Sequence, residues 1–192
     1  MASNQEIEIK FRAASLRKII AGLRAAGFRR ITQRTHELNT LYDLPGHPLQ
    51  RRGELLRLRE YGTAWTLTHK SRGKGGRYKT RLEIETAVQE GHKMELILRA
   101  LGFRPGFRYE KFRAEWSDGS GHVVVDETPI GNFGEIEGRP RWIDRTARIL
   151  EIQPADYITD TYLQLFAQWK QRTRSVAKEM TFHAISRRRG SR

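Results

Sequence analysis

Polar and apolar residues alternate along much of the chain, and this pattern predicts β-strands. In the segment EIEIKF, Glu6, Glu8 and Lys10 fall on one face, and the apolar residues between them fall on the other. Further strand-like runs follow, separated by turn segments such as LPGHP and SRGKGG, and their succession favours antiparallel pairing. These runs cover residues 36–43, 54–61, 63–70, 78–86, 107–116, 121–127 and 132–137.

Apolar residues at helical spacing predict four helices. In the first helix, Ser15 is placed to cap the N-terminus and Gly27 is placed to end the last turn. The four segments cover residues 15–27, 89–101, 141–150 and a stretch that Pro154 opens and that carries an apolar stripe from Ile158 to Trp169.

In strand after strand, charged residues occupy every second position and so share the polar face of the predicted strand. In YKTRLEIE, for example, Lys79, Arg81, Glu83 and Glu85 share one face. Taken singly, each such face is expected to look at solvent. Taken together, with helices packed on the apolar faces, the strands predict a barrel that encloses the charges. The expected fold class is α+β, an eight-stranded antiparallel closed β-barrel with flanking helices.

Enclosed charges are costly unless they pair with one another and with a ligand. The enclosed charges form a carboxylate set and a cationic set. The carboxylates offer the oxygen ligands that Mg²⁺ or Mn²⁺ prefers. The cations can bind phosphate oxygens, because guanidinium and ammonium groups donate charge-assisted hydrogen bonds. A polyphosphate bound to a divalent metal would satisfy both. The carboxylate set is Glu6, Glu8, Asp126, Glu135 and Glu137, and the cationic set is Lys10, Arg57, Arg59, Lys70, Arg81, Lys111 and Arg113.

The composition narrows the classes of function that the chain can have. Its 192 residues suit one domain, and 36 Lys and Arg against 22 Asp and Glu give a net charge of +14, which indicates a polyanionic partner. The absence of cysteine excludes disulfides, thiolate zinc sites and cysteine nucleophiles. No apolar stretch is long enough for a membrane span or a secretory signal, so we expect a cytoplasmic protein.

The ExExK pattern formed by Glu6, Glu8 and Lys10 begins a series of motifs that resembles the CYTH superfamily, the triphosphate tunnel metalloenzymes. The motifs that follow in order are NTLYDLP, LLRLR, LTHK, RLEIE, YEKFR, VVVDE and GEIEG, and the later TYLQLF is similar to the closing helix of that family. The resemblance covers residues 6 to about 138. It implies an eight-stranded tunnel that binds a triphosphate lengthwise with divalent metal. The expected domain spans residues 1–182, and a basic, disordered tail spans residues 183–192.

The resemblance also implies roles for individual residues. The carboxylate set would hold Mg²⁺ or Mn²⁺, with Asp126 assisting directly or through water, and the cationic set would hold phosphate oxygens. Lys70 and Tyr42 would also help to orient or activate a nucleophile. Two further carboxylates, those of Glu83 and Glu85, either bind a second metal or orient neighbouring cations.

Three activities remain open from the sequence. The stretch from LGFRPGFRYEKFRAEW to GEIEG is most similar to class IV adenylyl cyclases, which convert ATP to cyclic AMP and pyrophosphate. The alternative is an inorganic or thiamine triphosphatase that releases orthophosphate, because the same clamp serves both reactions. A third alternative is a non-catalytic RNA- or polyphosphate-binding module, which the scarcity of aromatic residues beside the basic segments does not favour. A homodimer is compatible with the sequence.

Overall fold

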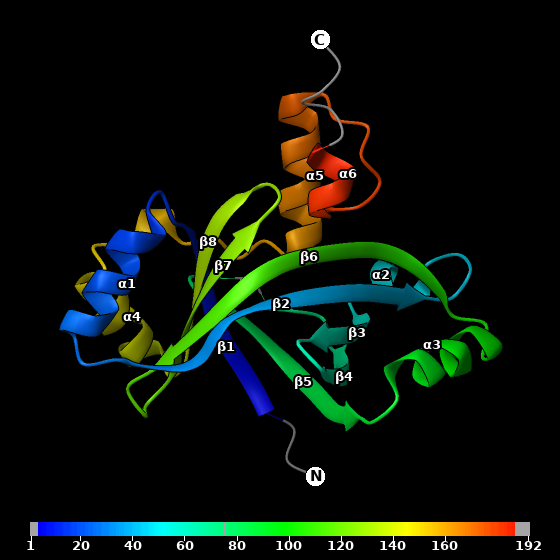
Figure 1. Cartoon of the computed structure of the whole chain (residues 1–192), viewed down its shortest axis with the longest axis horizontal. Coiled ribbons are helices and arrows are strands. Elements are labelled where there is room, and N and C mark those ends of the chain that lie inside the picture. The colour runs from blue at the N-terminus through cyan, green and yellow to red at the C-terminus, as the bar shows by residue number, and fades with distance from the viewer. Residues whose placement is uncertain (1–3, 75, 187–192) are drawn as a thin grey trace.

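A closed antiparallel barrel of eight strands forms the centre of the part of the chain that the computed structural model describes, residues 4–74 and 76–186 (Figure 1). The strands are hydrogen-bonded in the order β1-β5-β4-β3-β2-β6-β7-β8, which closes back on β1. The predicted fold class is therefore confirmed. The strands are β1 (Asn4–Arg12), β2 (Arg29–Asp43), β3 (Leu55–Tyr61), β4 (Ala64–Lys70), β5 (Lys79–Val88), β6 (Arg104–Ser117), β7 (His122–Thr128) and β8 (Gly131–Glu137).

The strand register places the charged faces on the inside of the barrel. Glu6 on β1 lies opposite Arg81 on β5, and Glu8 lies opposite Glu137 on β8. Side chains of directly opposed residues point to the same face of a sheet, so these charges share the interior. Ile9, which lies between Glu8 and Lys10 in the sequence, points outward and is fully buried beneath the helices.

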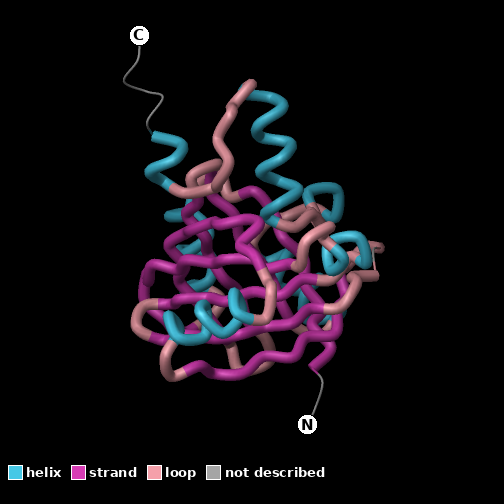
Figure 2. Tube along the Cα trace, turned by 90° about the vertical axis from the view of Figure 1, so that its right-hand side faces the viewer, coloured by secondary structure: helices cyan, strands magenta, loops and turns pink. Residues whose placement is uncertain are grey.

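Helices cover the outside of the barrel in three places (Figures 1 and 2). The α1 and α4 helices pack on β1, β7 and β8. The α5 helix and the segment that follows it pack on β6 and β8. The α3 helix packs on β2 to β4. None of the helices in the described part of the chain has the length and apolar character of a membrane-crossing helix. The helices are α1 (Leu16–Ala25), α2 (Pro48–Arg52), α3 (Gly91–Ala100), α4 (Pro140–Ile149), α5 (Tyr162–Thr173) and α6 (Phe182–Ser186), with a 3₁₀ turn at Pro154–Asp156.

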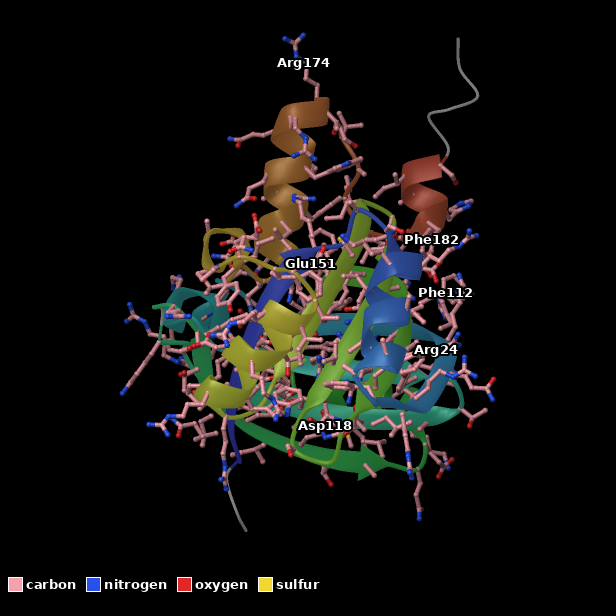
Figure 3. The ribbon with its side chains drawn as sticks, turned by 90° about the vertical axis from the view of Figure 1, so that its left-hand side faces the viewer. Arg24, Phe112, Asp118, Glu151, Arg174 and Phe182 are labelled. Atoms are coloured by element: carbon pink, nitrogen blue, oxygen red, sulfur yellow. The ribbon has the colours of Figure 1, made fainter. Side chains whose placement is uncertain are left out.

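The α1 and α4 helices lie side by side in front of the barrel (Figure 3). Ser15 caps α1 as predicted, since its side chain accepts a hydrogen bond from a backbone N–H of the first turn at 3.3 Å. Asp118, in the turn between β6 and β7, anchors α4. Its carboxylate accepts hydrogen bonds from Trp142 Nε1 and from Arg145 Nη2, both at 2.9 Å.

The helix that was expected to open at Pro154 begins later. Pro154–Asp156 forms only the 3₁₀ turn, and α5 starts after Thr161, which caps it through a reciprocal capping box. Between them, Ile158 is extended and exchanges two backbone hydrogen bonds with Lys10 of β1, at 3.0 and 2.7 Å. The capping box and this pairing with a strand edge outweigh the helix-opening tendency of the proline.

Other boundaries also differ from the prediction. The β2 strand begins at Arg29 rather than at residue 36. The prediction missed its first half because this half is largely exposed and lacks the alternating pattern of polar and apolar residues. The α2 and α6 helices have five residues each, too few for a periodic signal. Residues 183–186, which were expected to begin a disordered tail, instead belong to α6, and the remaining tail residues, 187–192, lie outside the described residues.

The chain after β8 completes one end of the barrel. Ile158 adds to the edge of β1 as described, and Met180 adds to the edge of β6, where it exchanges backbone hydrogen bonds with Arg108 and Glu110 at 3.0 and 3.1 Å. These additions satisfy backbone groups that the barrel strands leave unpaired. They also fix the start of α5 against the end of the barrel interior.

We expect Gly134→Ala to destabilise the fold by about 1–3 kcal/mol, as overpacking of a core does. Gly134 lies on β8 against the ring of Phe11, and a Cβ atom there would come within 2.1 Å of that ring. Phe11 is only 1% exposed, so the ring cannot turn away without disturbing the core. Gly106→Ala is the matched control, because the nearest atom to its Cβ would be 3.8 Å away. Equal urea unfolding midpoints for the two variants would contradict this packing.

Candidate functional site

The interior of the barrel is a charged cavity of about 670 Å³, which we call the tunnel. Every member of the predicted cationic set and four members of the carboxylate set line the tunnel, whereas Asp126 does not. The charged residues that line the tunnel are Glu6, Glu8, Lys10, Arg57, Arg59, Lys70, Lys79, Arg81, Glu83, Glu85, Lys111, Arg113, Glu115, Glu135 and Glu137.

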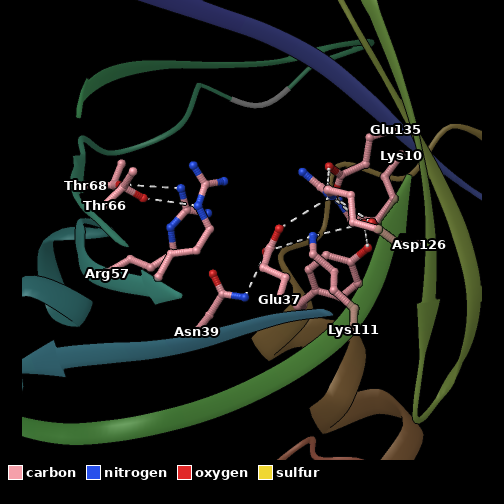
Figure 4. Close-up of polar contacts among 12 residues, drawn as sticks. Lys10, Glu37, Asn39, Arg57, Thr66, Thr68, Lys111, Asp126 and Glu135 are labelled. Carbon is pink, nitrogen blue, oxygen red and sulfur yellow. Dashed lines mark hydrogen bonds and ion pairs between the residues drawn. The ribbon is translucent and has the colours of Figure 1, made fainter. Parts of the chain in front are cut away.

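Asp126 on β7 holds two of the predicted phosphate-binding cations (Figure 4). Its carboxylate accepts hydrogen bonds from Lys111 Nζ at 3.0 Å and from Arg113 Nε and Nη2 at 2.7 Å. The hydroxyl of Tyr162 donates a further bond at 2.6 Å, and the Asp126 side chain is 0% exposed. In this arrangement Asp126 fixes the two cations. It lies on the interior face of β7, opposite Arg113, but Lys111, Arg113 and Tyr162 cover its oxygens, so it does not line the tunnel.

Glu37 on β2 lies beside the same two cations. Its carboxylate is 3.4 Å from Lys111 Nζ and 3.8 Å from Arg113 Nε, and Asn39 Nδ2 donates a hydrogen bond to it at 2.8 Å. Burial alone would raise the pKa of Glu37, but Lys111 and Arg113 outweigh it and lower that pKa to about 2. Glu37 therefore carries its negative charge throughout the neutral range.

An aromatic residue and an ion-pair network line the end of the tunnel at α5. Glu135 on β8 pairs with Lys10 Nζ and also with Arg113 Nη2 at 2.5 Å. Although burial opposes it, the charge of Lys10 keeps the pKa of Glu135 well below its usual range. The ring of Tyr162 lies 4.7 Å from Lys10 Nζ and 4.8 Å from Lys111 Nζ, within cation–π distance.

Arg57 on β3 lies across the tunnel from this network (Figure 4), and Arg59 on the same strand also lines the tunnel. Both guanidinium groups contact the carboxylate of Glu85, at 3.3 Å for Arg57 and 3.0 Å for Arg59. Thr68 donates a hydrogen bond to the same carboxylate at 2.6 Å and accepts one from Arg57 at 3.2 Å. Glu85 thus orients the two guanidinium groups in this structure.

One part of the tunnel lining, which we call the carboxylate patch, brings together Glu6 and Glu8 of β1, Glu83 of β5 and Glu137 of β8. Lys70 Nζ contacts Glu6 Oε1 at 2.7 Å and Glu83 Oε2 at 3.0 Å. Lys79 Nζ contacts Glu8 Oε1 at 3.0 Å. Each of these ammonium groups therefore already has a carboxylate partner before any ligand is considered.

Repulsion among the carboxylates affects their titration in the carboxylate patch. Partial burial, together with the charges of Glu6 and Glu8, raises the pKa of Glu137 to about 7. Burial and the charge of Glu8 likewise raise the pKa of Glu6. Burial acts in the same direction on Glu8, but Lys10 and Lys79 outweigh it and lower its pKa to about 2. Among the described residues, Glu137 has no ion-pair partner.

The donor atoms of the carboxylate patch suit a hard divalent cation. They are carboxylate oxygens, which Mg²⁺ and Mn²⁺ prefer, and a cation would relieve the repulsion that raises the pKa of Glu137. Within residues 4–74 and 76–186, no three acidic or histidine side chains are arranged around a common metal position, and Lys70 and Lys79 contact Glu6 and Glu8. The three glutamates therefore fit a metal by their chemistry, provided that these ammonium groups move to an anion.

Arg81 on β5 differs from the other tunnel cations. It is only 8% exposed, its Nε has no hydrogen-bond partner, and its Nη2 is 3.5 Å from the carbonyl oxygen of Gly53. It makes no ion pair with any described residue. A buried guanidinium without a counterion is unfavourable, so this position favours an anionic ligand.

Tyr42 does not fit its predicted role beside a nucleophile. It is absent from the tunnel lining, and its hydroxyl donates a hydrogen bond at 2.7 Å to Glu95 Oε1 on α3. Its ring packs with Leu58 and Leu98 between the barrel and that helix. The reason is the alternation of side chains along β2. Glu37 and Asn39 face the interior of the barrel, and Tyr42, an odd number of residues away, therefore points to the outer face.

Sequence reasoning missed three residues that shape the tunnel. Glu37 and Asn39 lie within the strand predicted at residues 36–43, and the parity rule applied to the other strands would have found them. Tyr162 was assigned to an apolar helix stripe. Its hydroxyl contacts a carboxylate 36 residues away along the chain, and no periodic pattern signals such a contact.

Comparisons with known proteins place this geometry among related chains. The family model described as the CYTH domain matches residues 4–177. A curated protein of Methanocaldococcus jannaschii, named as a putative adenylate cyclase, is 26% identical over 147 residues, which cover 76% of this chain and 83% of the relative.

Solved structures share the fold. One from Vibrio parahaemolyticus, described as a putative adenylate cyclase, has a TM-score of 0.75 at 18% identity and covers 86% of this chain and 99% of its own. Another, from Hippeastrum, is described as a putative adenylyl cyclase with a dominant triphosphatase activity. It has a TM-score of 0.63 at 20% identity and covers 85% of this chain and 95% of its own.

We expect Asp126→Asn to lower the free energy of unfolding by about 3–5 kcal/mol, the usual cost of breaking a buried ion pair. Lys111 and Arg113 would then remain buried beside a neutral side chain. Glu127→Gln is the neighbouring control, because Glu127 pairs with Arg34 at an exposed position and its loss should cost less than about 1 kcal/mol. Denaturant unfolding of both variants measures the difference, and equal losses would argue against a structural role for Asp126.

Glu137 should make the metal-free protein less stable as the pH rises. Its pKa is about 7 in the folded chain and lower in the unfolded chain, so the folded state retains a proton that the unfolded state has released. Its contribution to the free energy of unfolding should therefore fall between about pH 4.5 and about pH 7. Unfolding in the presence of chelator, compared with Glu137→Gln across this range, tests the sign. Parallel curves for the two proteins would show that Glu137 titrates normally.

Proposed function

Because this chain belongs to the CYTH domain family, we propose that it is a metal-dependent enzyme that acts on a triphosphate bound in the tunnel. One observation carries the proposal: cations from β1, β3, β4, β5 and β6 face a single cavity, and carboxylates hold several of them in place. Cations fixed in advance need little rearrangement when negative charge develops on phosphate oxygens. A triphosphate has the charge and the length to meet several of them at once.

The first candidate reaction is the cyclisation of ATP. The ribose 3′-hydroxyl attacks the α-phosphorus, the bond to the β-phosphate oxygen breaks, and the products are cyclic AMP, pyrophosphate and the proton of the hydroxyl. The name of the M. jannaschii relative supports this choice. The tunnel residues would bind and align the phosphates, so that the leaving pyrophosphate lies in line with the attacking oxygen.

Lys70 suits a binding role better than a role as a base. Burial and the nearby charge of Arg57 lower its pKa, but Glu6 and Glu83 outweigh them, so that the pKa is raised overall. The ammonium group therefore stays protonated at neutral pH and can donate hydrogen bonds to a phosphate oxygen or to the oxygen of a nucleophile. It could not accept the proton of an attacking hydroxyl.

Glu6, Glu8 and Glu137 would hold the divalent cation, and Glu135 would lie beside it. When bound, Mg²⁺ or Mn²⁺ would neutralise phosphate charge and polarise the phosphorus–oxygen bonds. A triphosphate that reaches Lys70 and Lys79 would take over these ammonium groups from Glu6 and Glu8 and free both carboxylates. Substrate and metal should therefore bind more tightly together than apart.

Hydrolysis by water at a terminal phosphorus is the second candidate reaction. The triphosphatase activity described for the Hippeastrum structure supports it, and the same cations would serve. Binding of RNA or polyphosphate without catalysis is a weaker alternative. It would rely on the outer surface, because charges nearly balance inside the tunnel and most of the net charge of +14 lies elsewhere.

Product analysis tests the proposal directly. The protein is incubated with ATP, inorganic triphosphate or thiamine triphosphate, each with Mg²⁺ or Mn²⁺ and with a chelator control. We expect cyclic AMP and pyrophosphate from ATP only when metal is present, and orthophosphate instead would select the second reaction. Turnover that persists in chelator would contradict the proposed metal dependence. If none of the substrates gave a product, the proposal that the protein is an enzyme would be wrong.

Arg59→Ala and Arg29→Ala separate tunnel binding from diffuse attraction. Arg59 lines the tunnel, whereas Arg29 is exposed at the start of β2. Loss of a charged hydrogen bond should lower kcat/KM by roughly 10- to 100-fold for Arg59→Ala, and Arg29→Ala should have little effect. Equal effects would mean that the substrate is attracted only by net charge.

A further inference from the structure

Tyr162, the first residue of α5, places an aromatic ring in the lining of the charged tunnel. Its side chain is buried, although the helix itself lies outside the barrel (Figure 1). The ring carries no net charge, and it is neither a ligand for Mg²⁺ nor a partner for phosphate. Its place among so many ionised groups therefore calls for another role.

The ring is a common neighbour of two tunnel cations. Lys10 Nζ lies 4.7 Å and Lys111 Nζ lies 4.8 Å from the ring centroid. Lys10 belongs to β1 and Lys111 belongs to β6, and β7 and β8 lie between these two strands in the barrel. The two ammonium groups repel each other, whereas the negative face of an aromatic ring attracts both. Tyr162 thus joins cations from strands that are not paired with each other.

A neutral ring holds a cation without cancelling its charge. Both ammonium groups also contact carboxylates. Lys10 pairs with Glu135, and Lys111 Nζ lies 3.0 Å from Asp126 Oδ2. These carboxylates offset the positive charge and so weaken its attraction for phosphate. The ring attracts the same groups and leaves their net charge unchanged. Because an ammonium group has three N–H donors, it can contact its carboxylate and still donate to a phosphate oxygen.

The hydroxyl group of Tyr162 fixes the ring in this position. It donates a hydrogen bond to Asp126 Oδ2 at 2.6 Å, and the same oxygen accepts bonds from Lys111 Nζ and Arg113 Nη2. Burial and the charge of Asp126 raise the pKa of Tyr162 well above its usual range, so the hydroxyl remains a donor at neutral pH. The ring therefore cannot turn away from Lys111 without breaking a buried, charge-assisted hydrogen bond.

Neighbouring side chains and the backbone also hold Tyr162. Tyr109 stacks on its ring with centroids 5.6 Å apart, and Phe133 meets it edge-on at 5.8 Å. Shortly before α5, the backbone of Ile158 exchanges hydrogen bonds with the backbone of Lys10. The segment that leads into α5 is thus tied to the strand that carries one of the two cations.

We propose that Tyr162 is a positioning residue that holds the ammonium groups of Lys10 and Lys111 toward one phosphate group of the bound triphosphate. The proposal rests on the proposed function, and it gives α5, which follows the barrel in the sequence, a part in ligand binding. Cations that are fixed before the ligand arrives need little rearrangement, and this raises the affinity for the ligand. If the ring only filled space, in contrast, its electron density would not matter.

Fluorination of the ring separates these two roles. Phenylalanine and its difluoro and trifluoro analogues are incorporated at position 162 of the full chain. Fluorine withdraws electron density from the face of the ring and weakens its attraction for a cation, while the size of the ring changes little. Binding of an imido-bridged triphosphate, which resists hydrolysis, is measured by calorimetry with Mg²⁺. We expect the affinity to fall at each step, by about tenfold over the series.

Equal affinity along this series would overturn the proposal, because it would show that the ring acts by its size alone. The wild-type protein is measured under the same conditions. If it binds the imido-bridged triphosphate while the fluorinated series shows no trend, only the role of Tyr162 is wrong. If the wild-type protein does not bind this ligand, the proposed function is wrong as well.

Substitution of Tyr162 gives an independent test. Tyr162→Leu removes the ring and should weaken binding of the imido-bridged triphosphate at least tenfold, whereas Tyr162→Phe retains the ring and should bind within about threefold of the wild type. Tyr78→Phe is the matched control, because Tyr78 donates a hydrogen bond to Asp144 at 2.8 Å outside the tunnel lining. Wild-type affinity in Tyr162→Leu would overturn the proposal. If that variant does not fold, the fluorinated series still decides the question.

Discussion

The pairing of buried charges is the constraint on which this structure depends. A barrel that encloses so many ionised groups is stable only if almost every one meets an opposite charge. Asp126 illustrates the requirement, because Lys111, Arg113 and Tyr162 all bind its carboxylate. The third of these partners comes from α5, so the helix that closes the barrel end also completes its electrostatics. Structure and site are therefore built from the same contacts.

Much of this arrangement follows from alternation in the sequence. The strand parity of EIEIK and RLEIE was enough to predict a closed barrel with charges inside, because each inward residue repeats every second position. Tyr162 could not be predicted, since its role depends on where a distant helix docks. Tyr42 was misjudged for the opposite reason: a motif resemblance suggested a catalytic position, while its parity on β2 already placed it on the outer face.

Arg81 is the exception to this pairing of charges. Its side chain is buried, and it forms no ion pair with any described residue. A buried guanidinium group without a counterion carries a free-energy cost, which an anionic ligand would remove.

The position of β1 between β5 and β8 has a consequence for the order in which the molecule is assembled. Glu8 on β1 lies opposite Glu137 on β8, about 130 residues later in the chain, so β8 is synthesised well after β1. The barrel can close only when β8 has been made, and closure then desolvates the charges of β1 beside the cations that offset them.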